Sequence, residues 1–134
     1  MRIVCDTNVL IAGVVADGLS RDLVKRRLPK HDLFVSEILL AELEEKLRDK
    51  FDVDPSKVPL VETYRQQATL VEPVPLTIPI SRDPDDDVVL ATAIAARADV
   101  IITGDNDLLV LRQYDGIQIV SPRQFLEMVD NPDR

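Results

Sequence analysis

The sequence predicts an α/β fold: a three-layer α/β/α sandwich around a central, mostly parallel sheet of about four to five strands. Short apolar runs that favour strands recur along the chain at residues 3–5, 33–35, 100–103 and 117–120. Stretches with helical features separate these runs. Strands that alternate with helices in this way form parallel sheets covered on both faces, which is the reason for predicting the sandwich.

Capping signals and apolar stripes place the helices. Ser36 is predicted to cap a helix whose apolar stripe has helical spacing and consists of Leu39, Leu40, Leu43 and Leu47. Residues 121–124, Ser-Pro-Arg-Gln, form a capping-box pattern that opens the last helix. Further helices are expected at 9–12, 19–28, 58–70 and 108–111, and the prolines within 71–79 keep that stretch extended.

A dense acidic stretch, Arg82 to Asp87, precedes residues 88–96, which are apolar almost all the way round a helix and are expected to be buried. Two carboxylates about 5 Å apart repel by about 3 kcal/mol at an effective dielectric of about 20. Protons or a divalent cation would relieve this repulsion. The alternative interpretation is that Pro84 and the aspartates only begin the helix, where the macrodipole favours carboxylates.

The composition predicts a single domain at residues 1–129, followed by a short frayed tail at 130–134. Of 134 residues, 46% are hydrophobic and 30% are charged, which is typical of a globular domain. Cys5 is the single cysteine, which excludes an intrachain disulfide and a cysteine zinc cluster. The first strand-like run follows Met1 closely and no apolar run reaches about 18 residues, so we expect a cytoplasmic protein without a signal peptide or a membrane helix.

The net charge of −8 argues against a polyanionic partner such as a nucleic acid. The charge is unevenly distributed, because residues 21–30 include five basic side chains and one acidic one. The residues considered for phosphate contact are Arg21, Lys25, Arg26 and Arg27. A solvated helix face and a phosphate-binding patch are equally compatible with this segment.

Polar side chains follow three of the predicted strands. Ligands of open parallel sheets bind beyond the carboxyl ends of the strands, where Asp6, Ser36 and Asp105 are expected. Topology therefore puts Asp6 and Asp105 on one edge. It does not by itself place Asp87 there. The helix of Asp87 would begin near the opposite edge unless the loop around Pro84 returns the chain to the carboxyl edge.

Two or more carboxylates at one edge, with Asn8 and Thr103 able to add neutral oxygens, suit Mg²⁺ or Mn²⁺. Such a metal can lower the pKa of a water and neutralise charge that develops on a phosphate, which is hydrolytic phosphoryl chemistry. Taken singly, Asp6, Asp105 and Asp107 are equally well interpreted as helix caps and loop residues.

Other chemistries lack their residues. A calcium-binding loop beginning at Asp83 is excluded, because Val88 stands where its glycine is needed and Ile94 where its glutamate is needed. His31 is the single histidine, so a pair of catalytic histidines is impossible. The glycine-rich nucleotide-binding motifs and the GxSxG serine motif are absent from the sequence.

Four segments resemble, in order, the motifs of PIN domains, a nuclease fold. Residues 6–10, Asp-Thr-Asn-Val-Leu, resemble the first motif, and residues 36–43, with Glu42 in the acidic position, resemble the second. Residues 83–93 resemble the third, with Asp87 aligned to its metal-binding aspartate. Residues 103–109 resemble the fourth, with Asp105 as the principal acid and Asp107 as an auxiliary one.

The resemblance implies a Mg²⁺- or Mn²⁺-dependent endoribonuclease that acts on single-stranded or structured RNA. It implies that the metal or metals are held by Asp6, Glu42, Asp87 and Asp105, with help from Asp107, and that the Asp87 helix begins at the acidic edge. Thr7, Asn8 or Thr103 would position ligands or substrate. The closing Ser-Pro-Arg-Gln-Phe-Leu pattern resembles the VapC-like group, often toxins of toxin–antitoxin pairs and commonly homodimers.

Two alternatives stay open at this point. One is a metal-dependent phosphatase that uses Asp6 as a covalent nucleophile, although Asn8 stands where a second aspartate would be wanted. The other is a non-catalytic PIN-like module that binds RNA or a protein partner. All the acidic positions are filled, so nothing in the sequence favours an inactive site.

Overall fold

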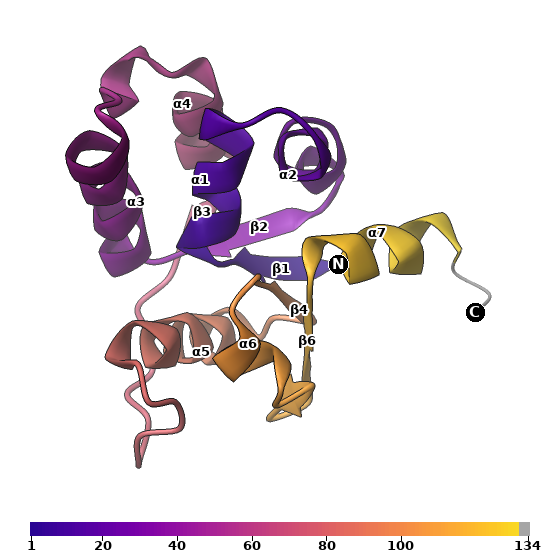
Figure 1. Cartoon of the computed structure of the whole chain (residues 1–134). Helices are drawn as coiled ribbons and strands as arrows, with labels where there is room; N and C mark the ends of the chain where they lie inside the picture. The colour runs from indigo at the N-terminus through magenta and orange to yellow at the C-terminus, as the bar shows by residue number, and fades with distance from the viewer. Residues whose placement is uncertain (132–134) are drawn as a thin grey trace.

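A six-stranded sheet forms the centre of the computed structural model, which describes residues 1–131 (Figure 1). The strand order is β3-β2-β1-β4-β6-β5, and every neighbouring pair is parallel except β5 and β6. The strands are β1 (Arg2–Cys5), β2 (Asp32–Val35), β3 (Thr69–Leu70), β4 (Val100–Ile102), β5 (Gln113–Tyr114) and β6 (Ile117–Val120). The predicted α/β class with a mostly parallel central sheet is confirmed.

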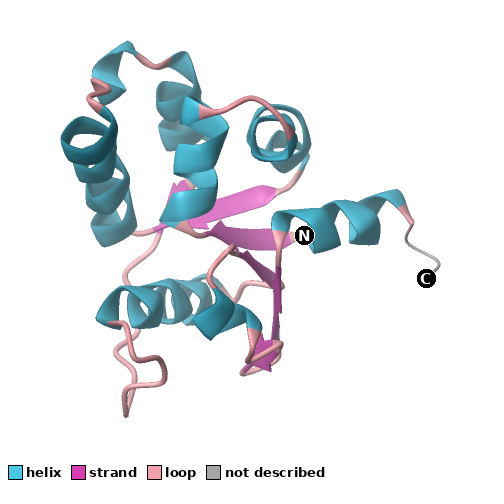
Figure 2. Cartoon of the chain, in the orientation of Figure 1, coloured by secondary structure: helices cyan, strands magenta, loops and turns pink. Residues whose placement is uncertain are grey.

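Helices cover both faces of this sheet (Figures 1 and 2). Helices α1, α3 and α4 lie over one face, and α5 and α6 lie over the other. The α-helices are α1 (Thr7–Val15), α2 (Leu19–Asp22), α3 (Glu37–Phe51), α4 (Pro59–Gln67), α5 (Pro84–Ala96), α6 (Asn106–Leu109) and α7 (Pro122–Asp130). Shorter turns of other helix types are η1 (Leu23–Arg27), η2 (Leu28–Lys30) and η3 (Pro55–Lys57). None of the helices within residues 1–131 is long and apolar enough to cross a membrane.

Three boundaries differ from the sequence predictions. The helix expected at 58–70 ends at Gln67, because Thr69 and Leu70 pair with β2 as the short edge strand β3. The helix expected at 19–28 changes from α to π geometry at Leu23, and Pro29 lies within the 3₁₀ turn that follows. Of the tail expected at 130–134, Asp130 belongs to α7 and residues 132–134 lie outside the described part of the chain.

The unpredicted strand β3 decides where α5 begins. Because β3 runs parallel to β2, it ends at the same edge as β1 and β4, and the connection to α5 starts there. At its other end α5 reaches the beginning of β1, where the Arg2 guanidinium donates to the carbonyl of Ala96 at 2.6 and 2.9 Å. The first turn of α5 therefore lies at the carboxyl edge of the sheet, as the resemblance to PIN domains implied and as topology alone had left open.

Apolar side chains from both helical layers anchor the helices to the sheet. The predicted stripe of α3 is buried at all four positions, Leu39, Leu40, Leu43 and Leu47. All three residues of β4 are buried as well, as expected of a central parallel strand. On the opposite face, buried alanines let α5 pack closely against the strands. Ser36 caps α3 as predicted, since its Oγ accepts a hydrogen bond from the backbone N–H of Leu39 at 3.3 Å.

The last helix, α7, begins with the predicted capping box. Ser121 Oγ accepts from the N–H of Gln124 at 3.1 Å, and Gln124 Oε1 accepts from the N–H of Ser121 at 2.8 Å. Because Phe125 lies just beyond the cap and is fully buried, the cap fixes the helix that carries this anchor.

We expect Ser121→Ala to lower the free energy of unfolding by about 1 kcal/mol, because an N–H of the first turn loses its acceptor. Ser121→Asp is the control, since it keeps an acceptor at this position. Urea unfolding followed by circular dichroism measures both. An alanine variant as stable as the parent would contradict a contribution of the capping box to stability.

Candidate metal centre

Three carboxylates converge at the carboxyl edge of the sheet. Asp83, Asp86 and Asp105 each offer an oxygen, and these oxygens lie within 4.8 Å of one another. Asp83 and Asp86 come from the beginning of α5, whereas Asp105 precedes α6. Residues about twenty positions apart in sequence thus form one acidic cluster.

Local helix geometry sets the two α5 carboxylates on one side. Asp83 caps α5, since its Oδ1 accepts from the N–H of Asp85 at 2.9 Å. Asp86 follows three residues later, and residues at this spacing share a helix face. The hydroxyl of Ser81 donates to Asp86 Oδ2 at 2.9 Å and so holds this carboxyl in place.

Asp105 is linked to Asp6 through the hydroxyl of Thr103. The N–H of Asp105 donates to Thr103 Oγ1 at 3.0 Å, and Thr103 Oγ1 donates to Asp6 Oδ2 at 2.7 Å. Asp105 also caps α6 by accepting from the N–H of Asp107 at 2.8 Å. This chain of hydrogen bonds orients two of the predicted acids at neighbouring strand ends.

Asp6 lies directly after β1 and is buried, with 6% of its surface exposed. It stands at the cap position of α1, and its carboxylate accepts from the hydroxyl of Thr103. Burial raises the pKa of Asp6 and the charge of Asp105 adds to this, while the bond from Thr103, the backbone of Asn8 and the charge of Lys46 act in the opposite direction.

Asp86 is the most strongly perturbed carboxyl of the cluster. Burial raises its pKa to about 7, and the negative charges of Asp105 and Asp83 act in the same direction. The hydroxyl of Ser81 opposes the shift by stabilising the charged form. The pair of Asp86 and Asp105 thus resists carrying two negative charges unless a cation is present.

The family of this chain follows from a comparison of its sequence with models of known families. The sequence model described as PIN domain matches residues 2–107. The chain belongs to the PIN domain family. A search of curated proteins finds no match. PIN domains are generally metal-dependent nucleases.

The cluster of this PIN domain fits a hard divalent cation. Its donors are three carboxylates, and Mg²⁺ and Mn²⁺ prefer oxygen ligands. The raised pKa of Asp86 is the second observation, since a cation would offset both the burial and the repulsion that raise this pKa. The acidic cluster can therefore bind a metal.

The structure directs Asp87 away from this cluster. Asp87 Oδ1 accepts from the N–H of Ser81 at 2.8 Å, and its two oxygens lie 3.3 and 3.2 Å from the N–H nitrogen of Ile80. Consecutive helical residues point about 100° apart, so Asp86 and Asp87 cannot face the same ligand equally. A metal-binding role for Asp87 stays a prediction. The sequence analysis did not include Asp86 among the candidate site residues. Its spacing of three from Asp83 and four from Leu90 places it on the helix face that these two residues share.

Glu42 lies on α3 and is paired with a lysine rather than grouped with the three aspartates. Lys46 Nζ lies 2.7 Å from Glu42 Oε1 and 3.4 Å from Asn8 Oδ1. These contacts bring Glu42 and Asn8, two predicted site residues from different helices, to one ammonium group. The sequence analysis did not single out Lys46, whose spacing of four from Glu42 indicates an ion pair.

The remaining predicted polar residues serve different local roles. Asp107 Oδ1 accepts from the guanidinium of Arg82 at 2.7 Å. The hydroxyl of Thr7 is buried and has no hydrogen-bond partner among residues 1–131. Ser36 is fully buried, and its Oγ lies 3.0 Å from Thr92 Oγ1, so it packs inside the fold beneath the site.

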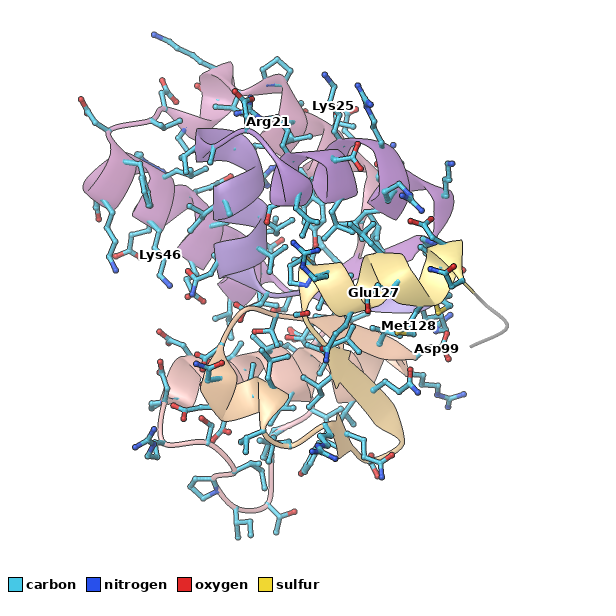
Figure 3. All side chains as sticks on the ribbon, turned by 45° about the vertical axis from the view of Figure 1, so that its right-hand side comes forward. Arg21, Lys25, Lys46, Asp99, Glu127 and Met128 are labelled. Atoms are coloured by element: carbon cyan, nitrogen blue, oxygen red, sulfur yellow. The ribbon has the colours of Figure 1, made fainter. Side chains whose placement is uncertain are left out.

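The basic segment at 21–30 is largely neutralised by nearby acids. Arg21 pairs with Asp17 and also donates to the carbonyls of Gly13 and Val14, and Arg27 pairs with Asp130. Arg26 lies 3.6 Å from Asp22, and Lys25 is exposed. Figure 3 shows Arg21 and Lys25 on the helical layer across the sheet from α5 and α6.

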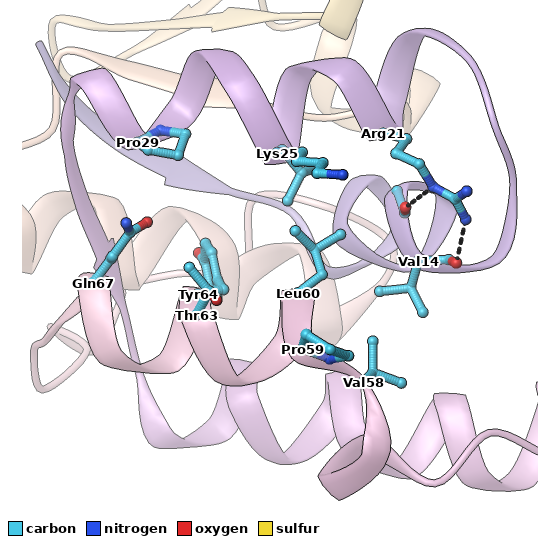
Figure 4. A pocket seen from close by; sticks show the side chains of 12 residues that line it. Val14, Arg21, Lys25, Pro29, Val58, Pro59, Leu60, Thr63, Tyr64 and Gln67 are labelled. Carbon is cyan, nitrogen blue, oxygen red and sulfur yellow. Dashed lines mark hydrogen bonds between the residues drawn. The ribbon is translucent and has the colours of Figure 1, made fainter.

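A groove of about 480 Å³ lies beside this basic segment, between it and α4 (Figure 4). Its lining is mainly apolar and includes Val14, Val24, Leu60 and Tyr64. Within residues 1–131 no aspartate or glutamate lines it, so this groove is separate from the carboxylate cluster. We place the candidate chemistry at the cluster, because carboxylates and perturbed pKa values coincide there.

We expect the metal-free PIN domain to lose stability as the pH rises. Folded Asp86 keeps its proton up to a pH of about 7, whereas its ordinary pKa is 3.8. Between these values the folded state binds more protons than the unfolded state, so the free energy of unfolding falls by up to about 1.4 kcal/mol per pH unit. Urea unfolding in EDTA between pH 5 and 8 measures the slope.

Asp86→Asn is the control for this pH dependence. The asparagine has no proton to lose, so the decline of stability between pH 5 and 7 should flatten. Equal slopes for parent and variant would contradict the assignment of this titration to Asp86.

Proposed function

We propose that this PIN domain is a Mg²⁺- or Mn²⁺-dependent endoribonuclease that hydrolyses phosphodiester bonds of RNA. The observation that carries the proposal is the convergence of Asp83, Asp86 and Asp105 within 4.8 Å in a chain of this family. The bond from Thr103 to Asp6, next to Asp105, adds a fourth acid at the same edge. Carboxylates held by hydrogen bonds before a ligand arrives favour catalysis over a passive acidic surface.

In this proposal Asp86 takes the place that the sequence resemblance gave to Asp87. Asp86 is buried beside Asp105, whereas the oxygens of Asp87 already accept hydrogen bonds from the 80–81 backbone. Asp87 then fixes the loop that carries Ser81, and Ser81 in turn orients Asp86. Asp6 and Glu42, which the resemblance made metal ligands, become supporting residues at the edge in this proposal, and Asp107 keeps its auxiliary role.

A bound Mg²⁺ or Mn²⁺ would supply a water of lowered pKa and positive charge for the phosphate. The residues of the chain would hold the cation and orient the acids around it. Asp86 and Asp105 hold the cation, and Thr103 keeps Asp6 oriented beside them. Asp86 loses its proton on metal binding, so binding is coupled to proton release below a pH of about 7.

The finer parts of the proposal concern partners. We propose RNA as the substrate, with exposed Lys25 as a phosphate contact. Arg21, Arg26 and Arg27 would contact phosphates by exchanging their ion pairs with Asp17, Asp22 and Asp130. We further propose that the protein is a VapC-like toxin with an antitoxin partner and that it forms a homodimer, on the resemblance of the closing pattern at 121–126. A cytoplasmic location stays a prediction.

We expect the purified protein to cleave RNA in the presence of Mn²⁺ and to lose this activity in EDTA. Asp86→Asn should reduce the cleavage rate by about 10²-fold or more, because a ligand of the cation is lost. Asp87→Asn is the matched variant, one residue further along α5, and should reduce the rate less. Cleavage of a labelled RNA under single-turnover conditions measures all three proteins.

The outcome decides between the functions considered. Equal loss in both variants would contradict the preference for Asp86. Cleavage that persists in EDTA would contradict the metal mechanism. Mn²⁺ binding and RNA binding without cleavage would favour a non-catalytic PIN domain.

A further inference from the structure

Lys46 of α3 places a positive charge beside the acidic residues at the carboxyl edge of the sheet. It projects from α3 (Figure 3). Its Nζ lies 2.7 Å from Glu42 Oε1 and 3.4 Å from Asn8 Oδ1. A carboxylate from α3 and an amide oxygen from α1 therefore meet at one ammonium group. These are oxygen donors of the kind that a hard cation takes.

Both partners of this ion pair are less than one quarter exposed, which holds for no other ion pair within residues 1–131. The side chains of Lys46 and Glu42 are 23% and 19% exposed, whereas Arg82, the other cation at this edge, is 87% exposed. Screening by water and salt weakens exposed pairs far more than sheltered ones. Arg82 is also bound to Asp107, so it does not reach Glu42 and Asn8.

The oxygens of the edge form two groups. Asp83, Asp86 and Asp105 form the cluster described above, in which no lysine or arginine is bound to Asp86 or Asp105 among residues 1–131. Glu42 and Asn8 form the second group, and there Lys46 supplies the cation. Glu42, Lys46, Lys50 and Asp85 line one hollow of about 500 Å³. Asp85 directly precedes Asp86 in α5, so the hollow lies beside the helix turn that carries the first group.

We propose that the Lys46 ammonium is the built-in second cation of the centre, so that this PIN domain takes one divalent metal, at Asp86 and Asp105. The inference rests on the proposed function and deepens it. A divalent ion at Glu42 would have to displace the ammonium from its carboxylate and approach a positive charge. Lys46 instead offers a permanent positive charge for a phosphate, whatever the metal concentration.

The test counts Mn²⁺ ions bound per chain by the electron paramagnetic resonance signal of free Mn²⁺. We expect about one ion for the parent and about two for Lys46→Met, because Glu42 and Asn8 become free to bind a divalent ion. Lys46→Gln, which also removes the charge, should match Lys46→Met and serves if the methionine variant does not fold. The double variant Lys46→Met with Glu42→Gln should return to about one ion.

Lys50→Met is the matched control, since it removes an exposed lysine one turn further along the same helix, and it should bind about one ion. A parent that binds two ions, or Lys46 variants that still bind one, would overturn the inference while leaving the proposed function intact. A parent that binds none would overturn the metal centre itself, and the inference with it.

Discussion

Repulsion between carboxylates at the carboxyl edge of the sheet is the constraint around which this PIN domain is arranged. The fold buries Asp86 against Asp105 and buries Asp6 nearby, which would be unfavourable without compensation. The structure compensates each acid differently. Hydroxyls of Ser81 and Thr103 donate to Asp86 and Asp6, a proton on Asp86 reduces the charge, and Lys46 balances Glu42.

The backbone creates this concentration of charge through ordinary rules of α/β folds. Parallel strands end at one edge, and each following helix begins there, so acids at strand ends and in first helical turns converge. The short strand β3 also ends at this edge, so α5 begins there as well. Asp83, the cap residue of α5, therefore belongs to the cluster. The core of buried leucines and alanines on both sides of the sheet holds the edge rigid enough for such placement to matter.

The parts of the account that could be predicted are those that local patterns determine. The alternation of strands and helices, the caps at Ser36 and Ser121, and the PIN domain family were all predicted from the sequence, and the structure or the comparison confirmed them. The strand β3 was not readable, because two residues are too few to show a period and pair only through tertiary contact. The change from α to π geometry after Asp22 was not predicted either, because residues 19–28 were expected to form one continuous helix.

The acidic run at the start of α5 contains a distinction that the sequence does not show. Five consecutive positions contain four aspartates, and composition treats Asp86 and Asp87 alike. The difference arises from rotation about the helix axis and from the loop before α5, whose backbone N–H groups bind Asp87. The role of Lys46 beside Glu42 was not predicted either. Its contact with Asn8 joins two different helices and forms only in the folded structure.

The central claim is that a divalent metal is held between Asp86 and Asp105. Anomalous diffraction from crystals soaked in Mn²⁺ tests it most directly. The account predicts a peak within about 2.2 Å of an oxygen of each of these two carboxylates, with Asp87 still bound to the 80–81 backbone. A peak coordinated by Asp87 with Asp86 unliganded, or no peak at this edge in crystals of protein that cleaves RNA, would contradict it.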